Sequence, residues 1–166
     1  MTVVCYCNGV IASDSAITSD DICTAKVSKL RRLASGALFG YAGDSDVRAV
    51  IKLLDKIRDP DNIPTAKELA DVHQEIDALI VFPRGGVAMV SIGHDKAQGW
   101  WGQASIENRG ISAIGIGATF ALGAMAAGKS AIEAVTITCQ WVDGCRLPVH
   151  NLAIIPPTRR KKSDGK

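Results

Sequence analysis

The chain has 166 residues, of which 47% are hydrophobic and 22% charged, a balance typical of a globular protein rather than a disordered one. This length suits one domain with a sizeable core. The formal charge of +2 argues against a body that binds nucleic acid, and no apolar run reaches the ~18 residues of a membrane span. We therefore expect neither nucleic acid nor a membrane as a partner.

Four short extended segments are predicted near the start of the chain, each rich in apolar and β-branched residues: 2–7, 9–13, 22–33 and 37–42. Asn8-Gly9 separates the first two and is a strong signal for a tight hairpin turn. Ser35-Gly36 separates the last two. The first residues of the chain would therefore be held firmly by a sheet.

Helical spacing of apolar residues and N-cap signals predict four helices: from Asp44 or Ser45 to about Ile57, from Thr65 to about Glu75, 118–127, and from about Ser130 to Trp141. Further strands are predicted over 78–82, 87–92, 97–102, 111–116 and 149–155. This order lacks the regular βαβ alternation of a parallel sheet and predicts an α+β fold with antiparallel sheets. We expect a single domain over residues 1–155, followed by a basic, solvated tail over 156–166.

The five cysteines are an odd number, and the sequence begins without the pattern of a secretory signal. Both features favour reduced thiols in a cytoplasmic protein. Cys5 and Cys7 share one face of a predicted strand, but a metal site would need a second pair at ligand spacing, which the sequence lacks. We expect buried free thiols and neither a metal nor another cofactor.

Trp100 and Trp101 are the most conspicuous aromatic pair of the sequence. On a strand their rings would point to opposite faces, one toward the core and one outward. The outward ring would suit a subunit interface, or it would be partly buried within the monomer.

Thr2 directly follows Met1, and methionine aminopeptidases remove an initiator Met that precedes a small side chain. We expect Thr2 to begin the mature chain. A terminal Thr carries a nucleophile and a base on one residue, because the hydroxyl attacks while the freed α-amine takes the proton.

Three further residues stand where they could serve such a nucleophile. Asp14 follows the second predicted strand, and Lys29 lies among alternating apolar positions, where an inward ammonium needs a partner such as Asp14. Gly43 ends a strand, where a glycine lets the backbone approach a ligand and offer its N–H. Each residue also has an ordinary interpretation: a surface carboxylate, a lysine that extends to solvent, or a strand-end turn.

The order of these motifs resembles the proteasome β-subunit family, and within it the HslV-like bacterial threonine peptidases that work with a ring ATPase. The resemblance covers nearly all of Thr2 to Ile155 and is densest over residues 2–43. Five pieces carry it: Thr2 behind Met1, Gly-Val-Ile-Ala-Ser-Asp-Ser-Ala at 9–16, Lys-Leu-Arg-Arg-Leu at 29–33, Gly-Tyr-Ala-Gly at 40–43, and Gly-Ile-Gly at 115–117 before an Ala-rich helix. It implies a four-layer αββα sandwich of the N-terminal nucleophile hydrolase type.

The resemblance also implies catalytic roles. The Thr2 hydroxyl would attack a peptide carbonyl, with its own α-amine as general base. The Lys29 cation would disfavour protonation of that amine, and Asp14 would hold Lys29 in place. The N–H of Gly43 would stabilise the oxyanion, a donor whose loss typically costs ~3–4 kcal/mol.

Four more positions follow from the same resemblance. Thr18 would contact the substrate main chain by strand addition, and Tyr41 would floor a shallow pocket that prefers medium apolar side chains before the cut. The family's usual Gly-Ser-Gly has Ile116 in place of the serine, and Asp143 corresponds to an aspartate that normally supports the terminal amine. Without that serine hydroxyl, the proton network of the amine is thinner, which implies slow or abolished catalysis.

The implied function is a threonine-type endopeptidase in a self-compartmentalising, homo-oligomeric ring, hexameric or heptameric and possibly stacked. A AAA+ ATPase unfoldase would feed it unfolded polypeptide. Two alternatives remain open. A weak or inactive ring or scaffold subunit is favoured by Ile116 and by any retained Met1, and a small-molecule amidase on the same fold would be a monomer or dimer.

Overall fold

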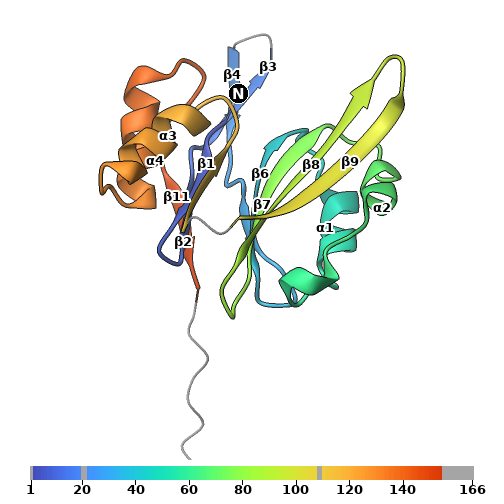
Figure 1. Ribbon diagram of the computed structural model, residues 1–166. Helices are drawn as coiled ribbons and strands as arrows, with labels where there is room; N and C mark the ends of the chain where they lie inside the picture. The colour runs from blue at the N-terminus through green and yellow to red at the C-terminus, as the bar shows by residue number, and fades with distance from the viewer. Residues whose placement is uncertain (1, 20–21, 108–109, 155–166) are drawn as a thin grey trace, which may run out of the picture.

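The computed structural model describes residues 2–19, 22–107 and 110–154, which form an α+β fold (Figure 1). The predicted fold class with antiparallel sheets is confirmed. The strands are β1 (Val4–Cys7), β2 (Val10–Ser13), β3 (Ala16–Ser19), β4 (Ile22–Lys26), β5 (Leu30–Arg32), β6 (Leu38–Gly43), β7 (Ile76–Val81), β8 (Val87–Asp95), β9 (Gly99–Glu107), β10 (Ile111–Ile114) and β11 (His150–Ala153). The helices are α1 (Arg48–Leu54), α2 (Ala66–Ala70), α3 (Ala118–Ala126) and α4 (Ala131–Trp141), with a 3₁₀ turn η1 at Pro60–Asn62.

A four-stranded sheet has the order β10-β1-β2-β11, with antiparallel pairing throughout. The predicted hairpin between β1 and β2 is present, because Asn8 and Gly9 both have positive φ, 49° and 82°, as a tight two-residue turn requires. Strand β1 lies between β10 and β2, so it is paired on both edges. This pairing fixes the residues that immediately precede β1.

A five-stranded sheet has the order β5-β6-β7-β8-β9, also antiparallel. Its longest strands, β8 and β9, have nine residues each, and their hairpin extends past the neighbouring strands at the upper right of Figure 1. Strands β3 and β4 form a separate two-stranded sheet near the start of the chain. Strand β3 was not predicted from the sequence, and its only pairing among the described residues is with β4.

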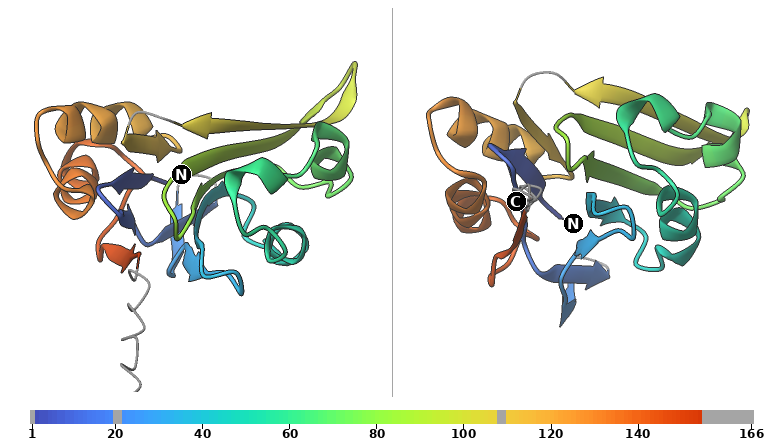
Figure 2. Two further views of the ribbon diagram at one scale, coloured as in Figure 1. Left: turned by 60° about the horizontal axis from the view of Figure 1, so that its bottom comes forward. Right: turned by 90° about the horizontal axis from the view of Figure 1, so that it is seen from below.

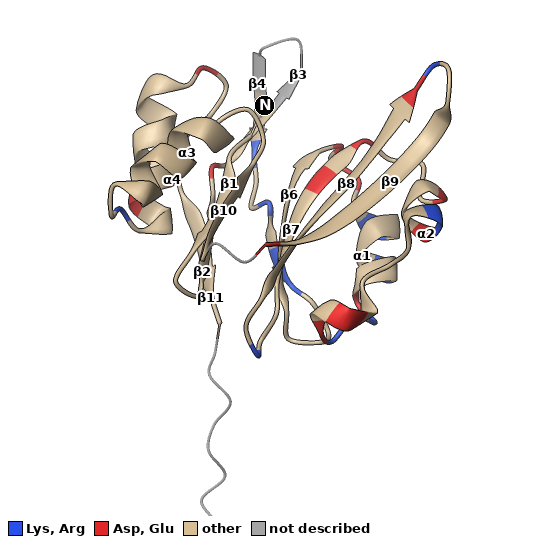
Figure 3. Ribbon diagram, in the orientation of Figure 1, with Lys and Arg blue, Asp and Glu red and all other residues tan. Residues whose placement is uncertain are grey.

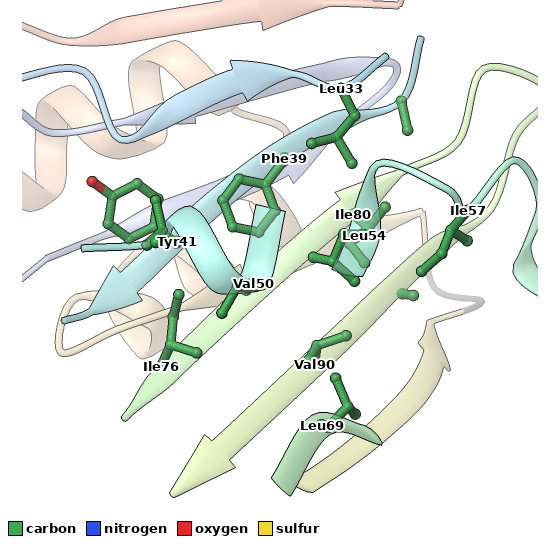
Figure 4. Close-up of a cluster of buried hydrophobic side chains, with 14 of the residues drawn as sticks. Leu33, Phe39, Tyr41, Val50, Leu54, Ile57, Leu69, Ile76, Ile80 and Val90 are labelled. Atoms are coloured by element: carbon green, nitrogen blue, oxygen red, sulfur yellow. The ribbon is translucent and has the colours of Figure 1, made fainter. Parts of the chain in front are cut away.

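Three clusters of buried hydrophobic side chains join these elements. One cluster lies between the two larger sheets and includes Val4, Ile11 and Leu79. A second joins the five-stranded sheet to α1 and α2, and Figure 4 shows its packing around Phe39 and Leu54. A third joins α3 and α4 to the four-stranded sheet. Figures 1 and 2 show the helix pairs on opposite sides of the two sheets.

The capping signals locate some helix ends and miss others. Thr65 and Ser130 both form capping boxes, at the start of α2 and α4. Helix α1 begins at Arg48, later than the predicted Asp44 or Ser45, because the Asp44 carboxylate instead accepts a hydrogen bond from the Glu75 N–H at 3.0 Å. Helix α2 ends at Ala70, short of the predicted Glu75, because the chain turns at His73, whose φ is 56°.

Several predictions concern the ends and environment of the chain. The basic tail over 156–166 lies outside the described residues. Across the ranges that the structure describes, no helix has both the length and the apolar character needed to cross a membrane. Cys5 and Cys7 are buried free thiols, as predicted.

Candidate active site

Thr2 is held immediately in front of β1 by contacts of the surrounding backbone. The next residue, Val3, exchanges two hydrogen bonds with Asp14: its N–H donates to the carboxylate at 3.1 Å, and its carbonyl accepts from the Asp14 N–H at 3.2 Å. The carbonyl of Thr2 accepts a bond from the Gly117 N–H at 3.4 Å. Gly115 has a φ of +85° and lies so close to that carbonyl that a Cβ would overlap it. Thr2 is therefore fixed in position and only 7% exposed.

The Lys29 ammonium links the hydroxyl of Thr2 to the carboxylate of Asp14. Its Nζ donates to Thr2 Oγ1 at 2.5 Å and to Asp14 Oδ1 at 2.8 Å. The lysine and aspartate side chains are 4% and 0% exposed, so this is a buried ion pair. Asp14 is the partner that the sequence analysis expects for Lys29. Because screening by water is weak here, the positive charge acts strongly on the adjacent hydroxyl oxygen.

Both carboxylate oxygens of Asp14 accept hydrogen bonds from the backbone. Val3 N–H and Lys29 reach Oδ1, whereas Ala16 N–H and Arg146 N–H reach Oδ2 at 3.0 and 3.3 Å. These four donors come from separate segments of the chain. They offset the cost of burying the carboxylate, and they fix the direction from which Lys29 approaches.

A segment with no signal in the sequence, around Arg146, completes this arrangement. The carbonyl of Arg146 accepts bonds from the N–H and the hydroxyl of Ser15, at 3.0 and 3.1 Å, while its N–H donates to Asp14. These bonds tie the loop after α4 to the end of β2. Backbone donors and acceptors have no residue-type signature, so the Arg146 contacts could not be found from the sequence.

Gly43, the last residue of β6, lies beside Thr2 in a conformation that only glycine adopts easily. Its φ is +118°, and a Cβ there would overlap the carbonyl oxygen of Glu75. Gly43 and Thr2 together line two separate cavities. The backbone of Gly43 is therefore accessible to any molecule that approaches the Thr2 hydroxyl.

The two cavities differ tenfold in size. The smaller holds about 50 Å³ and is lined by Thr2, Ala16, Ile17, Lys29, Tyr41, Gly43 and Ser45. The larger holds about 520 Å³. It extends from Thr2 and Gly43 over the start of β7, the end of β8 and the start of β9. Tyr41 stacks on Phe39 with a ring separation of 5.8 Å, and burial raises the pKa of its hydroxyl although nearby Arg31 lowers it. Tyr41 therefore forms a fixed wall of the smaller cavity.

The remaining predicted residues do not all reach this cluster. Ile116 is 58% exposed and lines the larger cavity next to Thr2. Asp143 is exposed, and within the described parts of the chain its carboxylate makes no hydrogen bond or ion pair. Thr18 lies in β3, and its side chain falls outside the described residues. Thr2, Asp14, Lys29, Gly43 and Tyr41 thus come together, with Ile116 at their edge.

The fold of this chain is similar to that of solved structures. No protein-family model and no curated protein matches the chain. Two solved structures of Thiobacillus denitrificans BPH are similar, one of them in complex with epoxomicin, with TM-scores of 0.62 and 0.63. Each is 18% identical and aligns over 94% of this chain and 100% of the other. At that identity, the likeness establishes a shared fold alone.

Proposed function

We propose that this protein is a threonine-type endopeptidase of the HslV and proteasome kind, with Thr2 as its nucleophile after removal of Met1. The observation that carries the proposal is the buried ammonium of Lys29, 2.5 Å from Thr2 Oγ1 and balanced by Asp14. Burying an ammonium costs free energy, and ionisable groups in such unfavourable positions gather at functional sites. The pair is expected where a hydroxyl must develop negative charge.

The proposal includes the four-layer αββα sandwich of N-terminal nucleophile hydrolases. The order of packing supports it: α1 and α2 on the five-stranded sheet, a cluster between the sheets, and α3 and α4 on the four-stranded sheet. In such a sandwich the nucleophile begins a central strand at the mouth between the sheets. The position of Thr2 directly before β1 fits that arrangement.

The proposed reaction begins when Thr2 Oγ1 attacks the scissile carbonyl and its free α-amine takes the hydroxyl proton, directly or through water. Lys29 stabilises the negative charge on Oγ1 and disfavours a second positive charge on the amine. The Gly43 N–H donates to the oxyanion. The tetrahedral intermediate then collapses, the amine returns its proton to the leaving nitrogen, and water hydrolyses the resulting threonine ester.

The smaller cavity would take the side chain that precedes the cut. Tyr41 in its wall favours a shallow pocket with a preference for medium apolar side chains. Profiling with a library of fluorogenic peptides tests this choice. Fastest cleavage after an acidic or basic residue would contradict it.

We also propose that the subunits form a closed, stacked ring. A site that cleaves any extended polypeptide must be kept from folded proteins, which a closed, stacked ring of six or seven subunits achieves with an ATPase to supply unfolded chains. Large apolar side chains are exposed on α3 and α4, and they would suit subunit contacts: Phe120, Ile132 and Trp141. Native mass spectrometry gives the subunit number, and a monomer or dimer would instead favour the small-molecule amidase.

The second candidate is an inactive ring or scaffold subunit, which two observations favour. Ile116 presents an apolar side chain where a hydroxyl would help to move protons, and Asp143 is exposed and makes no hydrogen bond or ion pair within the described residues. Intact mass shows whether Met1 is absent. Because the similar BPH structure binds epoxomicin, epoxomicin adduct formation by the wild type but not by Thr2→Ala then tests the enzyme directly. No adduct on a chain that has lost Met1 would favour the scaffold.

A further inference from the structure

The larger cavity beside Thr2 has a lining that suggests the chemistry of its occupant. A peptide whose carbonyl lies at Thr2 must extend in both directions. If the smaller cavity takes the side chain before the cut, the larger one lies on the side of the leaving group. Its lining beyond the residues shared with the smaller cavity includes Glu75, Asp77, Gly93, Trp101 and Ile116.

Trp101 forms an aromatic surface in this cavity. It pairs with Gly93 across β8 and β9, and a Cβ at Gly93 would lie 2.6 Å from the indole. The absence of a side chain at Gly93 therefore lets the ring lie against the neighbouring strand. Trp101 remains 43% exposed and lines the cavity, so part of its surface is open to a ligand. This is the outward tryptophan expected from the sequence, whereas Trp100 packs with His73 and His94.

Glu75 and Asp77 lie on the same face of the sheet as Trp101. Asp77 pairs with Ser91 and Ile76 pairs with Ile92, so Glu75, one residue earlier, lies across from Gly93. Gly93 of β8 and Trp101 of β9 thus form a row with Glu75, the residue immediately before β7. The row lies on the face that carries the buried cluster between the sheets, because side chains two apart share a face.

The Glu75 and Asp77 carboxylates form no ion pair with a lysine or arginine among the described residues. Asp77 accepts a bond from the Ser91 hydroxyl at 2.6 Å, and both acidic side chains are exposed. Acidic segments gather at this end of the five-stranded sheet, beside the site, in Figure 3. The cavity therefore combines a partly exposed indole with two acidic side chains.

We propose that this cavity binds the lysine or arginine side chain of the residue that follows the scissile bond. The cation would stack on Trp101 and pair with Glu75 and Asp77, while its methylene stem would lie along Ile116. The assignment of this residue to the leaving-group side rests on the proposed peptidase function. Recognition of a cationic side chain rests on Glu75, Asp77 and Trp101 alone.

A binding experiment tests recognition without requiring catalysis. Calorimetry would compare the tripeptide amides Arg-Ala-Ala and Glu-Ala-Ala, whose terminal amines are identical, on the wild type and on Thr2→Ala. Two attractive contacts in place of two repulsions predict about tenfold tighter binding of the arginine peptide at low salt. Glu75→Gln and Trp101→Leu should each lose most of this preference, and Trp101→Tyr should keep most of it.

Charge reversal separates recognition from a purely structural role. Glu75→Lys should invert the preference, so that Glu-Ala-Ala binds more tightly than Arg-Ala-Ala. Matched controls are Asp71→Asn, an exposed carboxylate at the end of α2, and Trp141→Leu, an exposed indole on α4. Both controls should keep the wild-type preference. Equal binding of the two peptides by the wild type, or an unchanged preference in Glu75→Lys, would overturn the proposal.

A cleavage experiment then places the cation relative to the cut. Quenched peptides that differ only after the scissile bond should be cleaved about tenfold faster with arginine than with glutamate there, and Glu75→Lys should reverse the order. Equal rates would refute the assignment to the leaving-group side. Binding of the arginine peptide without epoxomicin reactivity at Thr2 would refute the peptidase but retain the cation site. Epoxomicin reactivity at Thr2 without a preference for the arginine peptide would refute the cation site but retain the peptidase.

Discussion

Replacing Lys29 with methionine removes the ammonium while keeping a side chain of similar length. The change leaves Asp14 as a buried carboxylate whose charge is no longer paired. Breaking a buried ion pair typically costs ~3–5 kcal/mol. Three backbone N–H groups still donate to Asp14, so we expect the lower end of that range, about 3 kcal/mol.

Urea unfolding at a fixed protomer concentration measures this cost, since stability depends on concentration if the chain assembles. With an ordinary slope of about 2 kcal/mol/M, the midpoint should fall by about 1.5 M. Lys129→Met is the matched control, because Lys129 forms an exposed pair with Glu133 at 3.3 Å. That variant should change stability by less than ~0.5 kcal/mol.

Adding Asp14→Asn to Lys29→Met separates stability from chemistry. The double variant has no buried charge at this position, but its amide NH₂ must face one of the backbone donors, so stability should recover only in part. Reactivity with epoxomicin should stay absent in both variants. A single variant as stable as the wild type, or one that still reacts, would refute our account of Lys29.

Four further predictions follow from the site and the core. Gly43→Ala should abolish peptidase activity and destabilise the fold by more than ~1 kcal/mol, because its φ is +118° and a Cβ would overlap the Glu75 carbonyl; an active, stable variant would contradict this. Ile116→Ser should speed epoxomicin labelling several-fold by adding a hydroxyl beside Thr2, and a slower or unchanged rate would argue against a proton network there. Tyr41→Ala should enlarge the smaller cavity and shift cleavage toward larger residues before the cut, which library profiling measures. Burial raises the pKa of the Cys5 thiol from 9.0 to about 12, so the folded chain stays protonated where the unfolded chain ionises. Stability should therefore fall as pH rises above about 9, by up to ~1.4 kcal/mol per unit from this group, and Cys5→Ala should flatten that slope in urea titrations.

Local signals predicted the parts of the fold that short segments determine. Asn8-Gly9 indicated a hairpin because its two residues accept positive φ, and the structure has that turn. Thr65 and Ser130 indicated helix starts because their side chains cap the helix N-terminus. Asp14 and Lys29 could be paired in advance because a buried ammonium demands a partner.

Long-range contacts could not be predicted in the same way. The Arg146 N–H reaches Asp14 across 132 residues of sequence, and its side-chain identity has no part in that bond. Asp44 was predicted to cap a helix, but its carboxylate accepts a hydrogen bond from the Glu75 N–H. These two residues become neighbours only when the sheet forms. The row of Glu75, Gly93 and Trp101 depends on the register of three strands, which the periodicity of each strand leaves undetermined.

The hydrogen bonds to Asp14 include one from Arg146, near the end of the described chain. The Arg146 region leaves the ribosome long after Val3 and Lys29 have emerged. A nascent chain therefore lacks one of the hydrogen-bond donors to Asp14 throughout most of its synthesis. We expect the Thr2 hydroxyl and the Lys29 ammonium to reach their final alignment only when the Arg146 segment has docked. Under the proposed function, an unfinished chain would lack part of its active site, and a mutation that loosens the Arg146 segment would lower hydrolysis before it unfolds the protein.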